Sequence, residues 1–76
     1  MNNSVRATLE AGTVYTLHGE KSTFECICQL SDFYSPQHTF RLINTLSGWS
    51  FSAHGVNIYE DGTIDWDFST DGHFVK

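Results

Sequence analysis

Apolar and polar residues alternate with a period of two along most of the chain, a pattern typical of short strands with one buried face. Glycines follow each other at intervals of 7 to 10 residues, except for one glycine-free stretch from 20 to 47. Such spacing is typical of turns between short strands. The pattern therefore predicts a strand-rich chain with a different element in the glycine-free stretch.

The N-terminal segment predicts a hairpin. A three-residue loop, 10–12, with Gly12 in a left-handed conformation pairs Val5 with Leu17 and Ala7 with Tyr15. This register gathers the apolar groups on one face, whereas a two-residue turn separates them.

The segment STFECICQL predicts a third strand. Its core-facing side chains are expected to be Phe24, Cys26, Cys28 and Leu30. A disulfide between the two cysteines across one residue would be strained, so both are predicted to be buried free thiols. Free thiols suit a reducing cytosol.

The glycine-free stretch contains SPQHTFRLINTLSG, which predicts a helix over about 36–46. Ser35 suits an N-cap, Pro36 the first helical position and Gly48 the residue after the end. The expected buried stripe consists of Phe40, Leu42, Ile43 and Leu46.

The C-terminal third predicts a second hairpin. The side-chain parity changes after Ala53, so a bulge or corner is expected at His54 and Gly55. A two-residue turn at 61–62 would put Ile58 opposite Asp65, so a three-residue loop over 60–62 is preferred. This register pairs Ile58 with Ile64, Val56 with Trp66 and His54 with Phe68.

These elements predict an α+β fold in one compact domain, 1–76. The expected antiparallel β-sheet has about five to six strands in the order β-β-β-α-β-β, with one helix packed on one face. The alternative is a small, partly closed barrel with the helix plugging one end. A last short strand is expected at 73–75.

Charge adds one local feature. The net charge is −5, and five of the nine acidic residues lie between 60 and 71 with no lysine or arginine among them. The hairpin register places two of these acids on the outer face beside two polar or aromatic neighbours and two at the loop tip, and the fifth follows in the next turn. The predicted partner-binding residues are Asn57, Tyr59, Glu60, Asp61, Asp65, Asp67 and Asp71.

The expected partner is a protein with a basic surface. Only four lysine and arginine residues are present and they are scattered, so no direct nucleic-acid binding is expected. The first residues lack an export signal, and no apolar run approaches the length of a membrane span. We therefore expect a cytoplasmic protein without membrane contact.

Other functions remain open at this point. The acidic face could serve only solubility in a structural domain, or Asp65 and Asp67 could serve a metal-dependent enzyme. Oligomer formation through an exposed strand edge or the loop that carries Phe33 and Tyr34 is a further alternative, so the oligomeric state stays uncertain. The four histidines lack the paired spacing of a zinc site, and no catalytic, cofactor or metal motif is found.

The length of 76 residues, the acid-rich segment YEDGTIDWDFSTDG and the lack of a catalytic motif resemble small inhibitors encoded by phages and mobile elements, in particular anti-CRISPR and anti-restriction proteins. The resemblance is one of overall type and covers no alignable segment. It implies a non-enzymatic binder that blocks a nucleic-acid-binding surface of a bacterial defence complex. A net charge of −5 favours local blocking of a basic patch over imitation of a whole duplex.

Overall fold

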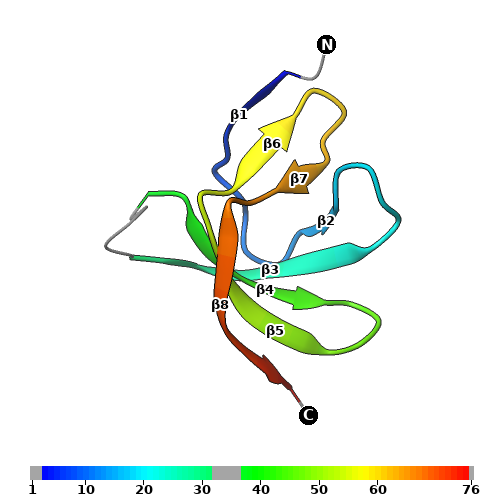
Figure 1. Cartoon of the computed structure of the whole chain (residues 1–76), viewed down its shortest axis with the longest axis vertical. Coiled ribbons are helices and arrows are strands. Elements are labelled where there is room, and N and C mark those ends of the chain that lie inside the picture. Colours follow the sequence, from blue (N-terminus) through cyan, green and yellow to red (C-terminus); the bar gives the residue numbers. More distant parts are fainter. Residues whose placement is uncertain (1–2, 32–36, 76) are drawn as a thin grey trace.

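The computed structural model describes residues 3–31 and 37–75. Within these residues all regular structure is β-structure, and no helix occurs that could cross a membrane. The strands are β1 (Ser4–Arg6), β2 (Val14–Thr16), β3 (Thr23–Leu30), β4 (Thr39–Asn44), β5 (Trp49–His54), β6 (Asn57–Tyr59), β7 (Ile64–Asp65) and β8 (Phe68–Phe74), as Figure 1 shows.

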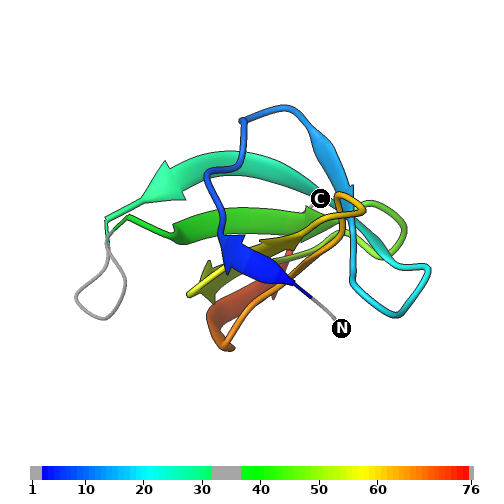
Figure 2. The same cartoon turned by 90° about the horizontal axis from the view of Figure 1, so that it is seen from above.

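The strands form two antiparallel sheets. One sheet has the order β1-β6-β7 and the other the order β2-β3-β4-β5-β8. A parallel bridge between Leu17 and Ile64 links the sheets on one side. The segment that joins β1 to β2 loops over one side of the molecule, so these two strands lie in different sheets (Figure 2).

The core lies between the sheets and draws residues from both. Its buried members are Ala7, Leu9, Phe24, Cys26, Phe40, Leu42, Phe51, Ala53, Val56 and Ile64. Trp66 packs against this cluster, with its ring 5.3 Å from that of Phe24 and 5.1 Å from that of Phe51. The contact with Phe24 is edge-to-face and the contact with Phe51 is tilted, and both add to the apolar area that this small domain buries.

A long bent hairpin connects the sheets. Strand β5 continues into β6, and β7 continues into β8, so each arm of the hairpin serves both sheets (Figure 1). The corner lies at Gly55, whose φ of 69° is in the left-handed region, which confirms the corner predicted at this position.

The predicted register of this hairpin is confirmed at two of its three pairs. Ile58 pairs with Ile64, and His54 pairs with Phe68. The three-residue loop is also confirmed, because Tyr59 N donates to the carbonyl oxygen of Thr63 at 2.8 Å and Gly62 has a φ of 86°.

The predicted helix over 36–46 is wrong for the part that the structure describes. Residues 39–44 form β4, and residues 45–47 form the turn to β5. Ser35 and Pro36, the expected helix start, lie outside the described residues. The α+β prediction is therefore replaced by an all-β fold, and no helix covers a sheet or plugs a barrel in the described part.

The physical reason lies in the alternation of this segment. Phe40 and Leu42 are fully buried, whereas the intervening Arg41 is only half-buried. This period of two suits a strand and not a helix. The Asn44 side chain caps the turn by accepting hydrogen bonds from the backbone N of Leu46 and Ser47, at 2.9 and 2.8 Å.

The predicted N-terminal hairpin is also wrong. Val5 pairs with Ile58 and Tyr15 with Phe24, so β1 and β2 have different partners. Gly12 does adopt a left-handed conformation, with a φ of 89°, but its turn joins two sheets instead of two paired strands.

The third strand follows the prediction only in its first half. Phe24 and Cys26 are buried, but a register shift between Cys26 and Cys28 places Cys28 opposite Arg41 on the outer face. Cys28 is therefore an exposed free thiol and not a buried one. The expected strand at 73–75 is present as the end of β8, to Phe74.

Candidate binding surface

The β6–β7 hairpin presents two different surfaces. Directly paired residues share a face of a sheet, so Asn57 lies beside its partner Asp65 on the outer face, and Ile58 lies beside its partner Ile64 on the core face. Tyr59 has the same parity as Asn57 and joins the outer face. Three of the predicted partner-binding residues are thus brought together.

The carboxylate of Asp65 is held by two neighbours. Tyr59 Oη donates to Oδ2 at 2.6 Å, and Asn57 Nδ2 donates to Oδ1 at 3.1 Å. The hydrogen bond to Asp65 is the main cause that raises the pKa of Tyr59 above its ordinary value. The side chain of Asp65 is therefore fixed in orientation.

Asp61, at the loop tip, is held by its own turn. Thr63 donates to Oδ1 from its backbone N, at 3.0 Å, and from its hydroxyl. The hydroxyl bond is the largest and the backbone bond the second cause that lowers the pKa of Asp61 below its ordinary value. The turn thus favours the charged form of this carboxyl.

His18, from the β2–β3 loop, packs against this turn. Its Nδ1 lies 2.8 Å from the hydroxyl oxygen of Thr63. Because that hydroxyl donates its proton to Asp61, the histidine must be the donor, and Nδ1 carries a hydrogen. The imidazole also stacks on the ring of Tyr59, with centroids 3.6 Å apart and planes 4° apart.

Asp67 lies at the corner of the hairpin and not at its tip. Its Oδ2 is 3.1 Å from Nη1 of Arg6, and the same nitrogen donates to the carbonyl oxygen of Gly55 at 2.7 Å. About half of each side chain is exposed, 48% for Arg6 and 51% for Asp67. The negative charge of Asp67 is therefore balanced within the protein.

The remaining two predicted residues have different positions. Glu60 lies in the loop at the tip, and its Oε2 accepts a hydrogen bond from Asn3 Nδ2 at 2.7 Å. Asp71 belongs to β8 in the five-stranded sheet, where it has a φ of 56° at a register shift opposite 50–52. The predicted set thus divides into a tip group, a corner residue and one residue on the other sheet.

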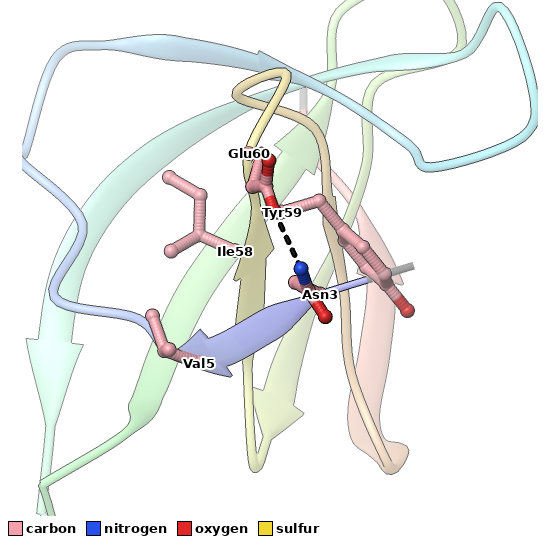
Figure 3. A pocket seen from close by; sticks show the side chains of 5 residues that line it. All are labelled: Asn3, Val5, Ile58, Tyr59 and Glu60. Atoms are coloured by element: carbon pink, nitrogen blue, oxygen red, sulfur yellow. Dashed lines mark hydrogen bonds between the residues drawn. The ribbon is translucent and has the colours of Figure 1, made fainter. Parts of the chain in front are cut away.

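A pocket of about 360 Å³ lies beside the tip, between β1 and β6. Figure 3 shows Val5 next to Ile58, the hydrogen bond between Asn3 and Glu60, and the ring of Tyr59 pointing away from Val5. Val5 is 67% exposed, which is unusual for a valine on the core-facing side of a strand. The pocket thus has an apolar wall and a carboxylate at its rim.

The two arginines lie away from the tip. Arg6 is bound to Asp67, and Arg41 lies on the outer face of the five-stranded sheet. Arg41 donates to the hydroxyls of Ser50 and Ser52, at 2.9 and 3.0 Å, and to His73 Nδ1 at 2.6 Å. Within the described residues, the tip carboxylates therefore form no ion pair with a cationic side chain.

The carboxylates of Asp65 and Asp67 do not act together. Asp65 is bound by Tyr59 and Asn57, whereas Asp67 is bound by Arg6. Among residues 3–31 and 37–75, no group of three or more histidine, cysteine, aspartate or glutamate side chains is placed to hold a metal ion. The loop with Phe33 and Tyr34, named as an oligomer contact, lies outside the described residues.

The sequence interpretation missed four residues of this surface: Asn3, Val5, Arg6 and His18. Val5 and Arg6 belong to β1 and Asn3 directly precedes it, and β1 pairs with a strand about fifty positions later in the chain. No local pattern indicates that pairing. His18 is outside the predicted set, and its position next to Gly19 is the only feature of the sequence that indicates a loop at this residue.

Comparisons with known proteins found no match. No protein-family description matches the chain, and neither a curated protein nor a solved structure matches it.

Proposed function

We propose that the protein is a non-enzymatic binding protein that uses the tip of the β6–β7 hairpin to occupy a basic surface of another protein. The observation that carries the proposal is the state of Asp61 and Asp65. Internal hydrogen bonds orient both carboxylates, and neither forms an ion pair among the described residues. Charges that are already oriented lose little conformational entropy when a partner binds.

The tip also provides the mixture of groups that protein interfaces use. Tyr59 supplies a rigid aromatic ring, stacked on His18, next to the carboxylates. The predicted set narrows accordingly: Asn57, Tyr59, Glu60, Asp61 and Asp65 are proposed as partner-binding residues, while Asp67 supports the corner.

The identity of the partner is a further part of this proposal. The overall resemblance to phage and mobile-element inhibitors supports a nucleic-acid-handling complex of bacterial defence, such as a CRISPR or restriction complex, in the host cytoplasm. The protein would then cover lysines and arginines that the complex uses to bind nucleic acid. Chains with a local acidic surface are suited to this competition.

The test removes charge without changing shape. Asp61→Asn with Asp65→Asn keeps an oxygen acceptor at both positions, and Glu20→Gln with Glu25→Gln removes the same charge elsewhere. A partner captured from host lysate is purified and titrated with each variant by calorimetry. We expect the tip variant to bind about 3- to 30-fold more weakly, mainly through a slower on-rate, and the control to bind as the original protein does.

Equal affinity of the tip variant and the original protein would overturn the proposal. The fold of each variant is checked by its amide NMR spectrum, which should change only near the substituted residues. Raising the ionic strength should weaken binding of the original protein more than that of the tip variant, because salt screens exposed charges.

A further inference from the structure

The pocket beside the hairpin tip lies at a free sheet edge. Strand β1 is the end strand of the order β1-β6-β7. Ala7 N donates to the carbonyl oxygen of Val56 at 2.9 Å, and bonded and non-bonded pairs alternate in an antiparallel ladder. The backbone groups of Ser4 and Arg6 therefore point away from β6, where the described chain provides no further strand.

Two apolar side chains next to this edge lie on the same face of the sheet. Val5 and Ile58 are cross-strand partners on one face, and they form the apolar wall of the pocket (Figure 3). A residue added directly opposite Val5 on a further antiparallel strand would share that face. Its side chain would then extend along Val5 and Ile58.

The negative charge at the rim of the pocket favours a side chain that carries a positive charge. Glu60 lines the pocket, and only its Oε2 is bonded to Asn3, so Oε1 keeps its lone pairs for another donor. Arg6 lies on the opposite face of β1, bound to Asp67. The pocket therefore combines an apolar wall with an uncompensated carboxylate, which fits the methylene stem and charged end of a basic side chain.

We infer that an extended segment of the partner protein pairs with the free edge of β1 and places a lysine or arginine side chain in the pocket, along Val5 and Ile58 and with its charge at Glu60. Strand addition of this kind takes its affinity from the backbone and its selectivity from alternate side-chain pockets. The inference rests on the proposed function, because it specifies how a basic partner meets this surface.

The test uses a probe of known composition. A blocked peptide, acetyl-Thr-Val-Lys-Val-Thr-amide, is titrated into the labelled protein and followed by the amide NMR signals of 3–7 and 56–60. We expect saturating shifts confined to these residues. A peptide with norleucine in place of lysine should bind about two- to fivefold more weakly, the range of an exposed ion pair.

A double-mutant cycle identifies the acceptor. In Glu60→Gln the preference for lysine over norleucine should disappear, whereas Glu20→Gln should keep it. Val5→Thr keeps the branched shape of the strand residue but removes an apolar methyl, and it should weaken both peptides alike. A peptide whose backbone nitrogens are methylated on the pairing side should not bind.

Three results would overturn the inference: no saturating shift at millimolar peptide, equal binding of the lysine and norleucine peptides, or shifts elsewhere on the molecule. Self-association through this edge would also overturn it, and would appear as a doubled mass in sedimentation without peptide. The proposed function is judged separately, because it depends on Asp61 and Asp65, which the peptide test leaves unchanged.

Discussion

Arg6 and Asp67 join the first and last thirds of the chain, with Nη1 of the arginine 3.1 Å from Oδ2 of the aspartate, at the corner where the long hairpin passes between the sheets. Both side chains are about half exposed, so the ion pair itself should contribute little. A double-mutant cycle with Arg6→Gln and Asp67→Asn should give a coupling of about 0.2–1 kcal/mol in urea denaturation. A coupling above about 2 kcal/mol would contradict this estimate.

Gly55 is expected to be more sensitive to substitution than Gly62, the glycine of the hairpin loop. A Cβ at this position would lie 2.3 Å from Oδ2 of Asp67 and 2.7 Å from Nη1 of Arg6. Gly62 also has a positive φ, but a Cβ there meets nothing within 4 Å. Gly62→Ala should therefore cost about 1–2 kcal/mol of unfolding free energy from backbone strain. Gly55→Ala should cost up to about 1 kcal/mol more, because the half-exposed ends of Asp67 and Arg6 must move aside and give up their ion pair. Equal costs in urea denaturation would contradict the contact.

Two leucines that the helix prediction placed on one buried stripe should differ strongly. Leu42 is fully buried in β4, whereas Leu46 is 96% exposed in the following turn. Leu42→Ala should cost about 2–5 kcal/mol, and Leu46→Ala less than about 0.5 kcal/mol. Should Leu42→Ala fail to fold, Leu42→Val gives a milder change of about 1 kcal/mol. Similar losses at both positions would favour a helix.

Tyr59 should titrate at higher pH than an ordinary tyrosine. Its hydroxyl donates to Asp65, which raises its pKa, so the neutral form is favoured in the folded protein. The resulting stabilisation is fully present below the unfolded-state pKa of about 10 and is lost as the pH rises through the raised folded-state pKa. NMR titration of the tyrosine ring carbons should show this, and Asp65→Asn should return Tyr59 toward its ordinary pKa.

Asp61 should titrate at lower pH than an ordinary aspartate. The hydroxyl and backbone N of Thr63 lower its pKa, so its contribution to stability is present above the unfolded-state pKa of about 3.9 and is lost as the pH falls through the lowered folded-state pKa. Thr63→Val removes the hydroxyl donor and leaves the backbone bond. Carbon-detected titration of the Asp61 carboxyl should then show a higher pKa, and an unchanged value would exclude the hydroxyl as the main cause.

Local patterns were sufficient to predict the bent hairpin. The parity change before Gly55 and the sorting of acids from apolar groups determine where the corner and the loop lie, because a shift by one residue would bury carboxylates. In the segment 39–44, by contrast, helix-end residues outweighed a short period-two pattern. Proline and glycine suit turns between strands as well as helix ends, so these residues do not separate the two structures.

The partners of the N-terminal strand could not be found in this way. Register arguments compare neighbouring segments, and β1 pairs with a strand far along the chain. The same limit applied to the candidate surface: the hydrogen-bonded group around Asp65 lies within one hairpin and was predicted, whereas Arg6 and His18 reach it from other elements. The extra residue at Ile27, which turned Cys28 outward, has no local signature either.

The continuity of β5 with β6 and of β7 with β8 has a consequence for folding. Neither sheet is independent of the other, because each arm of the hairpin contributes one strand to each sheet. Unfolding of one sheet would therefore disrupt the strands that continue into the other. We expect both sheets to unfold in a single cooperative transition. Since β1 closes its sheet only by meeting β6, that transition also requires contacts between distant parts of the chain, which slows folding relative to a protein built from local hairpins.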